Sequence, residues 1–198
     1  TAVINSILKK SSKKPLQANA YVNIGSNNTS TNSKYNGQDF NQGFSVNGTV
    51  KKVNYLASIN SSESDGMSQI AALENQTNEN DRFSRVNYMS KIGFKASEKL
   101  TLDFFGNYDV LKNDYDFSYD NTGFNDTDLN KSNTEQFRFG FSPKYKYNRG
   151  EFVINSSFTK LQRDYSEFNS WTSVIENSLY ESRGINLDAF NKYKVSND

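Results

Sequence analysis

The chain contains no cysteine and no histidine. Their absence excludes disulfides, thiol catalysis, histidine-ligated haem, the usual zinc sites and a Ser-His-Asp triad. No stretch approaches the roughly 18 consecutive apolar residues of a transmembrane helix, which excludes a helical membrane protein. Basic and acidic residues nearly balance, at 23 against 22. This balance argues against a nucleic-acid partner, because nucleic-acid-binding proteins carry a clear basic excess.

The chain is also poor in apolar residues. Its hydrophobic fraction is 34% and its mean hydropathy is −0.81, values that by themselves would suggest disorder. Aromatic residues nevertheless make up 14% of the 198 residues, with 15 Phe, 12 Tyr and one Trp. Disordered chains are poor in aromatics, so the polarity needs another explanation.

That explanation is an alternation with a period of two. Between Leu16 and Ile24 every second residue is apolar, which is the pattern of a strand with one apolar face. Most of the segments that alternate in this way exceed the usual five or six residues of a soluble strand, and roughly nine to eleven tilted residues cross a bilayer. The predicted strands are 16–24, 44–50, 53–60, 85–94, 100–108, 136–147, 152–159 and, with the weakest pattern, 185–195.

The connections between these strands alternate in length. Three are tight (51–52, 96–98 and 148–150), and four are long and polar (26–42, 61–82, 112–134 and 166–182). Outer-membrane barrels have short periplasmic turns and long extracellular loops. Tyrosines near the predicted strand ends would suit the two aromatic belts of such a barrel. They are Tyr21, Tyr55, Tyr88, Tyr108, Tyr145, Tyr147 and Tyr165.

These patterns predict an all-β fold, specifically an antiparallel transmembrane β-barrel of about eight strands. A soluble antiparallel β protein with ordinary core aromatics is the alternative.

Several segments resemble TonB-dependent outer-membrane receptors. Residues 2–10, Ala-Val-Ile-Asn-Ser-Ile-Leu-Lys-Lys, resemble the end of the plug domain, with Ser6 in place of the usual isoleucine. Residues 11–15 then fill the link into the first barrel strand. Later segments are similar to successive strands and turns of the vitamin B12 receptor-like branch and of Bacteroidetes-type receptors. These segments are 54–66, 80–87, 95–102 and 135–145.

The resemblance implies that residues 1–15 end a plug domain and that residues 16–198 form the N-terminal portion of a 22-stranded barrel. It implies a location in the outer membrane of a Gram-negative bacterium and transport of a scarce nutrient such as cobalamin, a siderophore or haem. The implied partners are outer-membrane lipid, the remaining barrel strands, the nutrient, and TonB through a plug region outside this chain. A small self-closed barrel with a structural or adhesive role, and a soluble β-rich binding module, are the alternatives.

No catalytic constellation is visible, so no enzymatic activity is expected. Aromatic residues in the predicted long loops are candidates for stacking on a corrin, a haem, a siderophore or a sugar. The alternative is that the loops bury them against one another. The candidate ligand-binding residues are Tyr115, Phe117, Tyr119, Phe124, Phe168 and Trp171.

Receptors of the B12 type bind calcium in their extracellular loops, so the resemblance also implies a possible calcium cofactor. The matching carboxylates here are Asp65, Glu79, Asp81, Asp126 and Asp128. Two pairs of them are spaced two residues apart, which in an extended loop points both carboxylates the same way. The alternative is that each one is an ordinary solvated loop residue.

Overall fold

The computed structural model describes residues 11–26, 39–66, 80–116, 129–169 and 171–195. These residues form eight strands and no helix, and therefore contain no helix long and apolar enough to cross a membrane. The strands are β1 (Gln17–Gly25), β2 (Asp39–Val50), β3 (Val53–Ser64), β4 (Phe83–Lys95), β5 (Leu100–Asp114), β6 (Lys131–Tyr147), β7 (Gly150–Asn169) and β8 (Val174–Tyr193).

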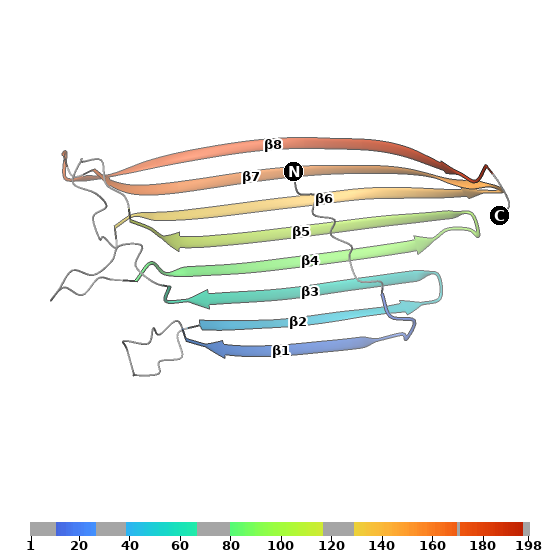
Figure 1. Ribbon diagram of the computed structural model, residues 1–198, viewed down its shortest axis with the longest axis horizontal. Helices are drawn as coiled ribbons and strands as arrows, with labels where there is room; N and C mark the ends of the chain where they lie inside the picture. Colours follow the sequence, from blue (N-terminus) through green and yellow to red (C-terminus); the bar gives the residue numbers. More distant parts are fainter. Residues whose placement is uncertain (1–10, 27–38, 67–79, 117–128, 170, 196–198) are drawn as a thin grey trace.

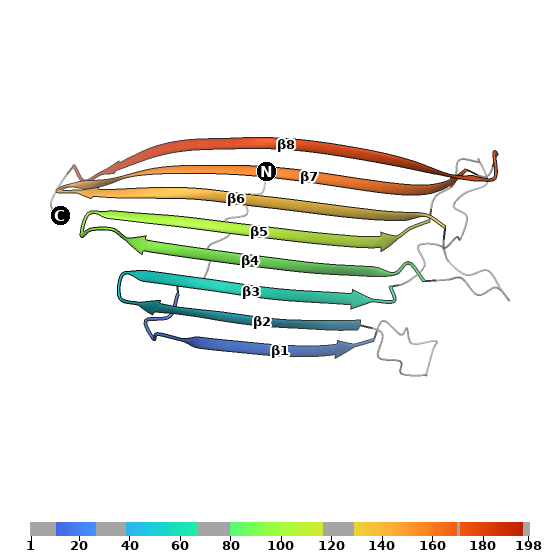
Figure 2. The same cartoon turned by 180° about the vertical axis from the view of Figure 1, so that it is seen from behind.

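All eight strands belong to one antiparallel sheet, in which each strand pairs with its neighbours in sequence (Figures 1 and 2). The all-β antiparallel prediction is therefore confirmed. The sheet is open, because β1 lies at one edge and β8 at the other (Figure 1). These eight strands do not close on themselves.

The tight turns at 51–52, 96–99 and 148–149 lie at one end of the sheet, and the strand ends at Gly25, Asp39, Ser64, Phe83, Asp114 and Lys131 lie at the other. The prediction of a fourth long loop at 166–182 is wrong. Strand β7 continues to Asn169 and pairs there with Val174, the first residue of β8. The many polar residues in 174–184 give no alternating pattern, so the sequence does not indicate a strand there. The strand forms because pairing depends on backbone hydrogen bonds as well as on apolar side chains.

The register gathers the large apolar side chains on one side of the sheet. Ala20, Phe44, Ile59, Tyr88, Tyr108 and Phe137 are successive cross-strand partners from β1 to β6. We call this side the apolar face and the opposite side the polar face. The exposed large apolar residues of the apolar face on β2–β7 are Phe40, Phe44, Val50, Val53, Ile59, Tyr88, Ile92, Phe94, Phe104, Tyr108, Phe137, Phe139, Tyr145 and Phe152.

Few side chains of the described sheet are buried, and its large apolar side chains are mostly exposed. Val153 is the only buried hydrophobic residue among those described, whereas Asn47, Asp116, Asn130 and Ser132 are buried. Soluble proteins bury their large apolar side chains and expose their polar ones. The sheet has no apolar core of its own, and its apolar face has no partner among the described residues.

The side chains of the polar face form hydrogen bonds with one another across neighbouring strands. Arg85 forms two hydrogen bonds to the Asp109 carboxylate, of 2.8 and 3.1 Å, and Asn87 donates a third of 3.1 Å. The Tyr21 hydroxyl on β1 reaches across β2 to Asn60 on β3, at 3.1 Å. These contacts satisfy side chains that would otherwise need water.

The segment that leads into β1 lies against the polar face. The backbone N–H of Ser12 donates to Oδ1 of Asn47 at 2.8 Å, and the Thr49 hydroxyl donates to the carbonyl of Ser12 at 2.7 Å. Asn47 and Thr49 both project from the polar side of β2, by alternation from Val46. The chain therefore approaches the first strand from the polar side.

Candidate ligand-binding site

Three tyrosines meet at the long-loop end of the polar face. Tyr115 directly follows β5, Tyr165 lies on β7 and Tyr180 on β8. The Tyr115 and Tyr165 ring centroids are 6.2 Å apart and those of Tyr165 and Tyr180 are 5.8 Å apart, each pair edge to face. This arrangement is the preferred one for aromatic pairs.

Two charged side chains complete this group. The Tyr115 hydroxyl donates to Oε1 of Glu167 at 2.8 Å, which ties the residue after β5 to β7. Nη1 of Arg163 donates to the Tyr165 hydroxyl at 3.3 Å, and the Arg163 guanidinium carbon lies 6.0 Å from the same ring. Tyr115, Tyr165, Tyr180, Arg163 and Glu167 are called the tyrosine cluster below.

A hollow of about 500 Å³ adjoins the tyrosine cluster and is formed largely by alternate residues of β7 and β8. Its surface offers aromatic rings, a guanidinium group, the carboxylates of Glu167 and Glu181, and the hydroxyls of Ser178 and Ser182. Flat rings pack on tyrosine, while the guanidinium can bind oxygen atoms of a ligand and the carboxylates can bind its hydroxyl groups. The arrangement suits a small ligand that combines an apolar ring with polar substituents.

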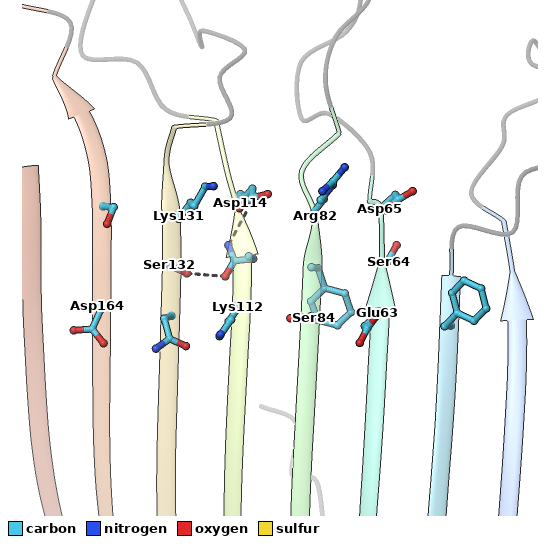
Figure 3. Close-up of a pocket in the computed structure, with 15 residues that line it drawn as sticks. Glu63, Ser64, Asp65, Arg82, Ser84, Lys112, Asp114, Lys131, Ser132 and Asp164 are labelled. Carbon is cyan, nitrogen blue, oxygen red and sulfur yellow. Dashed lines mark hydrogen bonds between the residues drawn. The ribbon is translucent and has the colours of Figure 1, made fainter. Parts of the chain in front are cut away.

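A second hollow, of about 680 Å³, lies at the same end across the ends of β2 to β7 (Figure 3). Most of its lining residues alternate onto the apolar face, just above the apolar side chains. Its charged residues have both signs: Glu63, Asp65, Arg82, Lys112, Asp114, Lys131 and Asp164. One side is held by a 2.6 Å hydrogen bond from Ser132 to Asn113, drawn in Figure 3. With mixed charges, this hollow does not favour an ion of either sign.

The structure brings one of the predicted aromatic residues, Tyr115, into the tyrosine cluster. Phe168 alternates to the side opposite Glu167, and its backbone N–H donates to Asn130 at 2.8 Å. Trp171 lies in the turn between β7 and β8 and is 81% exposed. Phe117, Tyr119 and Phe124 lie outside the described residues.

Two of the predicted calcium ligands can be placed. Asp65 lines the charged hollow of Figure 3, and Gly66 beside it has a φ of 68°. A Cβ on Gly66 would collide with the backbone oxygen of Asp81, so only glycine lets the two ends of this connection meet. The described residues contain no group of three or more metal-binding side chains. Glu79, Asp126 and Asp128 lie outside the described residues, so calcium binding stays an expectation.

The sequence did not indicate the rest of the tyrosine cluster. The sequence predicts that Tyr165 and Tyr21 lie in an interfacial belt. Both instead project from the polar face and hydrogen-bond there, so this prediction is wrong for them. Arg163, Tyr165 and Glu167 do share one face through their spacing of two. Only the strand register could bring Tyr115 and Tyr180 to them.

Comparisons with protein-family models, with curated proteins and with solved structures found no match to this chain. Its function is therefore argued from its own residues.

Proposed function

We propose that this chain is a section of a TonB-dependent outer-membrane receptor that imports a scarce nutrient. Residues 1–15 would end the plug domain, and residues 16–198 would form the first eight strands of the barrel. The main support is the exposed apolar face of the sheet, which lies opposite a hydrogen-bonded polar face. Lipid would cover the first face, and the plug and water would cover the second.

The dimensions of the apolar face agree with this proposal. On β5 it runs from Leu100 to Val110, which is ten steps along the strand. At about 3.4 Å per step and a tilt of about 45°, those residues would cover roughly 24 Å of membrane thickness, close to the usual apolar band of about 25 Å. In water, such a continuous apolar surface would drive aggregation.

The open edges support a section of a larger barrel over a complete small one. Every backbone polar group inside a membrane needs a hydrogen-bond partner, so β1 and β8 would each need a further neighbour. They are unequal in length, at 9 and 20 residues, and lie at opposite edges of the sheet. Further strands of the same protein would pair with both.

The path of residues 11–15 supports a plug. In a plugged barrel the plug domain fills the lumen, so its link must leave the first strand on the lumen side. Ser12 lies against the polar face through Asn47 and Thr49, on the side that would face the lumen. The tyrosine cluster lies on the same face at the long-loop end, where a nutrient from outside would first arrive.

The test is fractionation of the full-length gene product. We expect an open reading frame of several hundred residues, a protein found in the outer membrane, and a folded band that shifts on an SDS gel when the sample is boiled. A mature protein of only about this length with the same properties would favour the small self-closed barrel. A protein that stays folded and monomeric without detergent would favour a soluble binding module and overturn the proposal.

A further inference from the structure

We propose that residues 12–15 form a two-sided clamp on β2, which keeps the first strand paired when the chain before Ser12 is displaced. This inference rests on the proposed function, because it takes the chain before Ser12 to be the end of a plug domain. It adds a conformational role for the link, which neither the apolar face nor the resemblance specifies. The link is the blue segment that precedes β1 in Figure 1.

One half of the clamp lies on the polar side of β2. The backbone N–H of Ser12 donates to Oδ1 of Asn47 at 2.8 Å, and the carbonyl of Ser12 accepts from the Thr49 hydroxyl at 2.7 Å. Two side chains on one face of β2 therefore bind both backbone polar groups of Ser12. The backbone N–H of Thr49 also donates to the carbonyl of Lys14 at 2.9 Å. These three hydrogen bonds fix residues 12–14 to two positions on β2.

The other half lies on the apolar side of the same strand. Tyr55 on β3 is the cross-strand partner of Gly48, and its hydroxyl donates to the carbonyl of Pro15 at 2.9 Å. A Cβ on Gly48 would overlap the carbonyl oxygen of Pro15 and would lie 2.7 Å from its carbonyl carbon, so Pro15 passes directly over Gly48. Gly48 alternates with Asn47, which places Pro15 on the apolar side. The link therefore crosses from one side of β2 to the other between Ser12 and Pro15.

Burial identifies the clamp independently of its hydrogen bonds. Asn47 and Gly48 are the only buried residues of β1, β2 and β3, three strands that the structure describes in full. They are neighbours in sequence, so they face opposite sides of the sheet. Ser12 lies against Asn47, and Pro15 lies over Gly48. The link thus covers β2 on both sides at one point.

The strand that follows the clamp is weakly held. Strand β1 has nine residues, of which eight are exposed, and β2 is its only partner among the described strands. A short edge strand near a chain end is a part of a protein where local unfolding begins. The clamp adds hydrogen bonds from β2 and β3 at the end of β1 that a displacement of the preceding chain would reach first.

A displacement of the chain before Ser12 would therefore end at the clamp. To reach β1, it must break the bonds made by Asn47, Thr49 and Tyr55 together, because a link held on both sides of β2 cannot be lifted away from one face alone. Pro15 suits its position, since it has no N–H that would need a partner at the turn into the strand. The sheet can thus keep β1 paired while a domain attached to the link changes conformation.

The experiment measures hydrogen exchange of the full-length gene product in detergent by mass spectrometry. The clamp variant, Asn47→Ala with Thr49→Val and Tyr55→Phe, removes the three side-chain hydrogen bonds to the link. We expect the amides of 17–25 to exchange at least about tenfold faster in this variant, and those of β5 to exchange as in the wild type. The matched control is Ser45→Ala with Thr101→Val and Tyr145→Phe, which makes similar changes away from the link. It should leave the exchange of 17–25 unchanged.

A pulling measurement tests the conformational role itself. When the full-length protein is held in a bilayer and pulled from its N-terminus, we expect the wild type to release the chain before Ser12 and the strand β1 in separate events. In the clamp variant, both should leave in one event. Release in a single event from the wild type would overturn the clamp inference.

The outcomes separate this inference from the proposed function. Unchanged exchange of 17–25 in the clamp variant would overturn only the clamp. A gene product that is soluble without detergent, but in which the clamp variant still loosens β1, would overturn the proposed function and keep the clamp. If the clamp variant fails to fold, Gly48→Ala decides the question, because it displaces Pro15 and leaves every hydrogen-bonding side chain in place. Faster exchange of 17–25 in Gly48→Ala would support the clamp, and unchanged exchange would overturn it.

Discussion

The ring of Phe105 on β5 lies directly over Gly140, its cross-strand partner on β6. A Cβ on Gly140 would overlap Cε1 of Phe105 and would lie 2.7 Å from the backbone oxygen of Ser156 on β7. Groups from β5 and β7 therefore leave room for no side chain at position 140 of β6, so only a glycine fits there.

Gly140→Ala should destabilise the folded protein by about 1–3 kcal/mol, because the ring and the neighbouring backbone must both move. The matched control is Gly184→Ala on β8, where no described atom lies within 4 Å of the new Cβ. Denaturant unfolding in detergent would measure both free energies. Equal costs for the two variants would contradict the packing of Phe105 on Gly140.

Ile92→Arg tests which face of the sheet meets lipid. Ile92 projects from the apolar face of β4 and is 52% exposed. A charge near the middle of the membrane should cost about 2–4 kcal/mol, and it should reduce the yield of folded protein in lipid vesicles.

Met89→Arg is the control for this substitution, since Met89 lies on the polar face of the same strand, opposite Asn107. It should cost much less, because the new guanidinium faces water and hydrogen-bonding side chains. In a soluble sheet the order would be different: Ile92→Arg would be neutral or would improve solubility.

Tyr165→Ala should weaken nutrient binding, because Tyr165 is the central ring of the tyrosine cluster. Quenching of intrinsic fluorescence by cyanocobalamin, haemin or a ferric siderophore would identify which of them binds to the wild type. For that ligand we expect a loss of about 5–50-fold, the range for removing one aromatic contact in a binding site. Trp171→Ala should change the affinity less than twofold. A large effect at Trp171 with none at Tyr165 would place the site at the β7–β8 turn instead.

Calcium binding in the loops would raise the unfolding temperature of the protein in detergent. The predicted ligands Asp65 and Asp81 lie at the two ends of one connection, which meet at Gly66. Asp65→Asn should therefore reduce the calcium-induced shift, because a carboxylate is replaced by a weaker neutral ligand. The control is Ser45→Ala in the middle of β2, which should leave the calcium-induced shift unchanged. If a calcium titration gives no thermal shift and no binding heat, calcium is ruled out as a cofactor.

Alternation was sufficient to predict that the chain forms antiparallel strands and which residues of a strand share a face. Because side chains change sides at every residue of a strand, Phe44, Ile59 and Tyr88 could be placed on a common face before any pairing was known. The tight turns predicted at 51–52 and 148–150 followed from the interruption of that alternation. These features depend only on neighbouring residues in the sequence, so they can be predicted without the structure.

The length of β8, the openness of the sheet and the tyrosine cluster depended on the tertiary structure. Residues 174–184 are too polar to indicate a strand, and they become one because β7 offers a ladder of backbone hydrogen bonds as far as Asn169. Tyr115 and Glu167 are 52 residues apart, and only the register of β5, β6 and β7 brings the hydroxyl within 2.8 Å of the carboxylate. Periodicity decides which side a residue faces, whereas register, a property of strand pairs, decides which residues it meets.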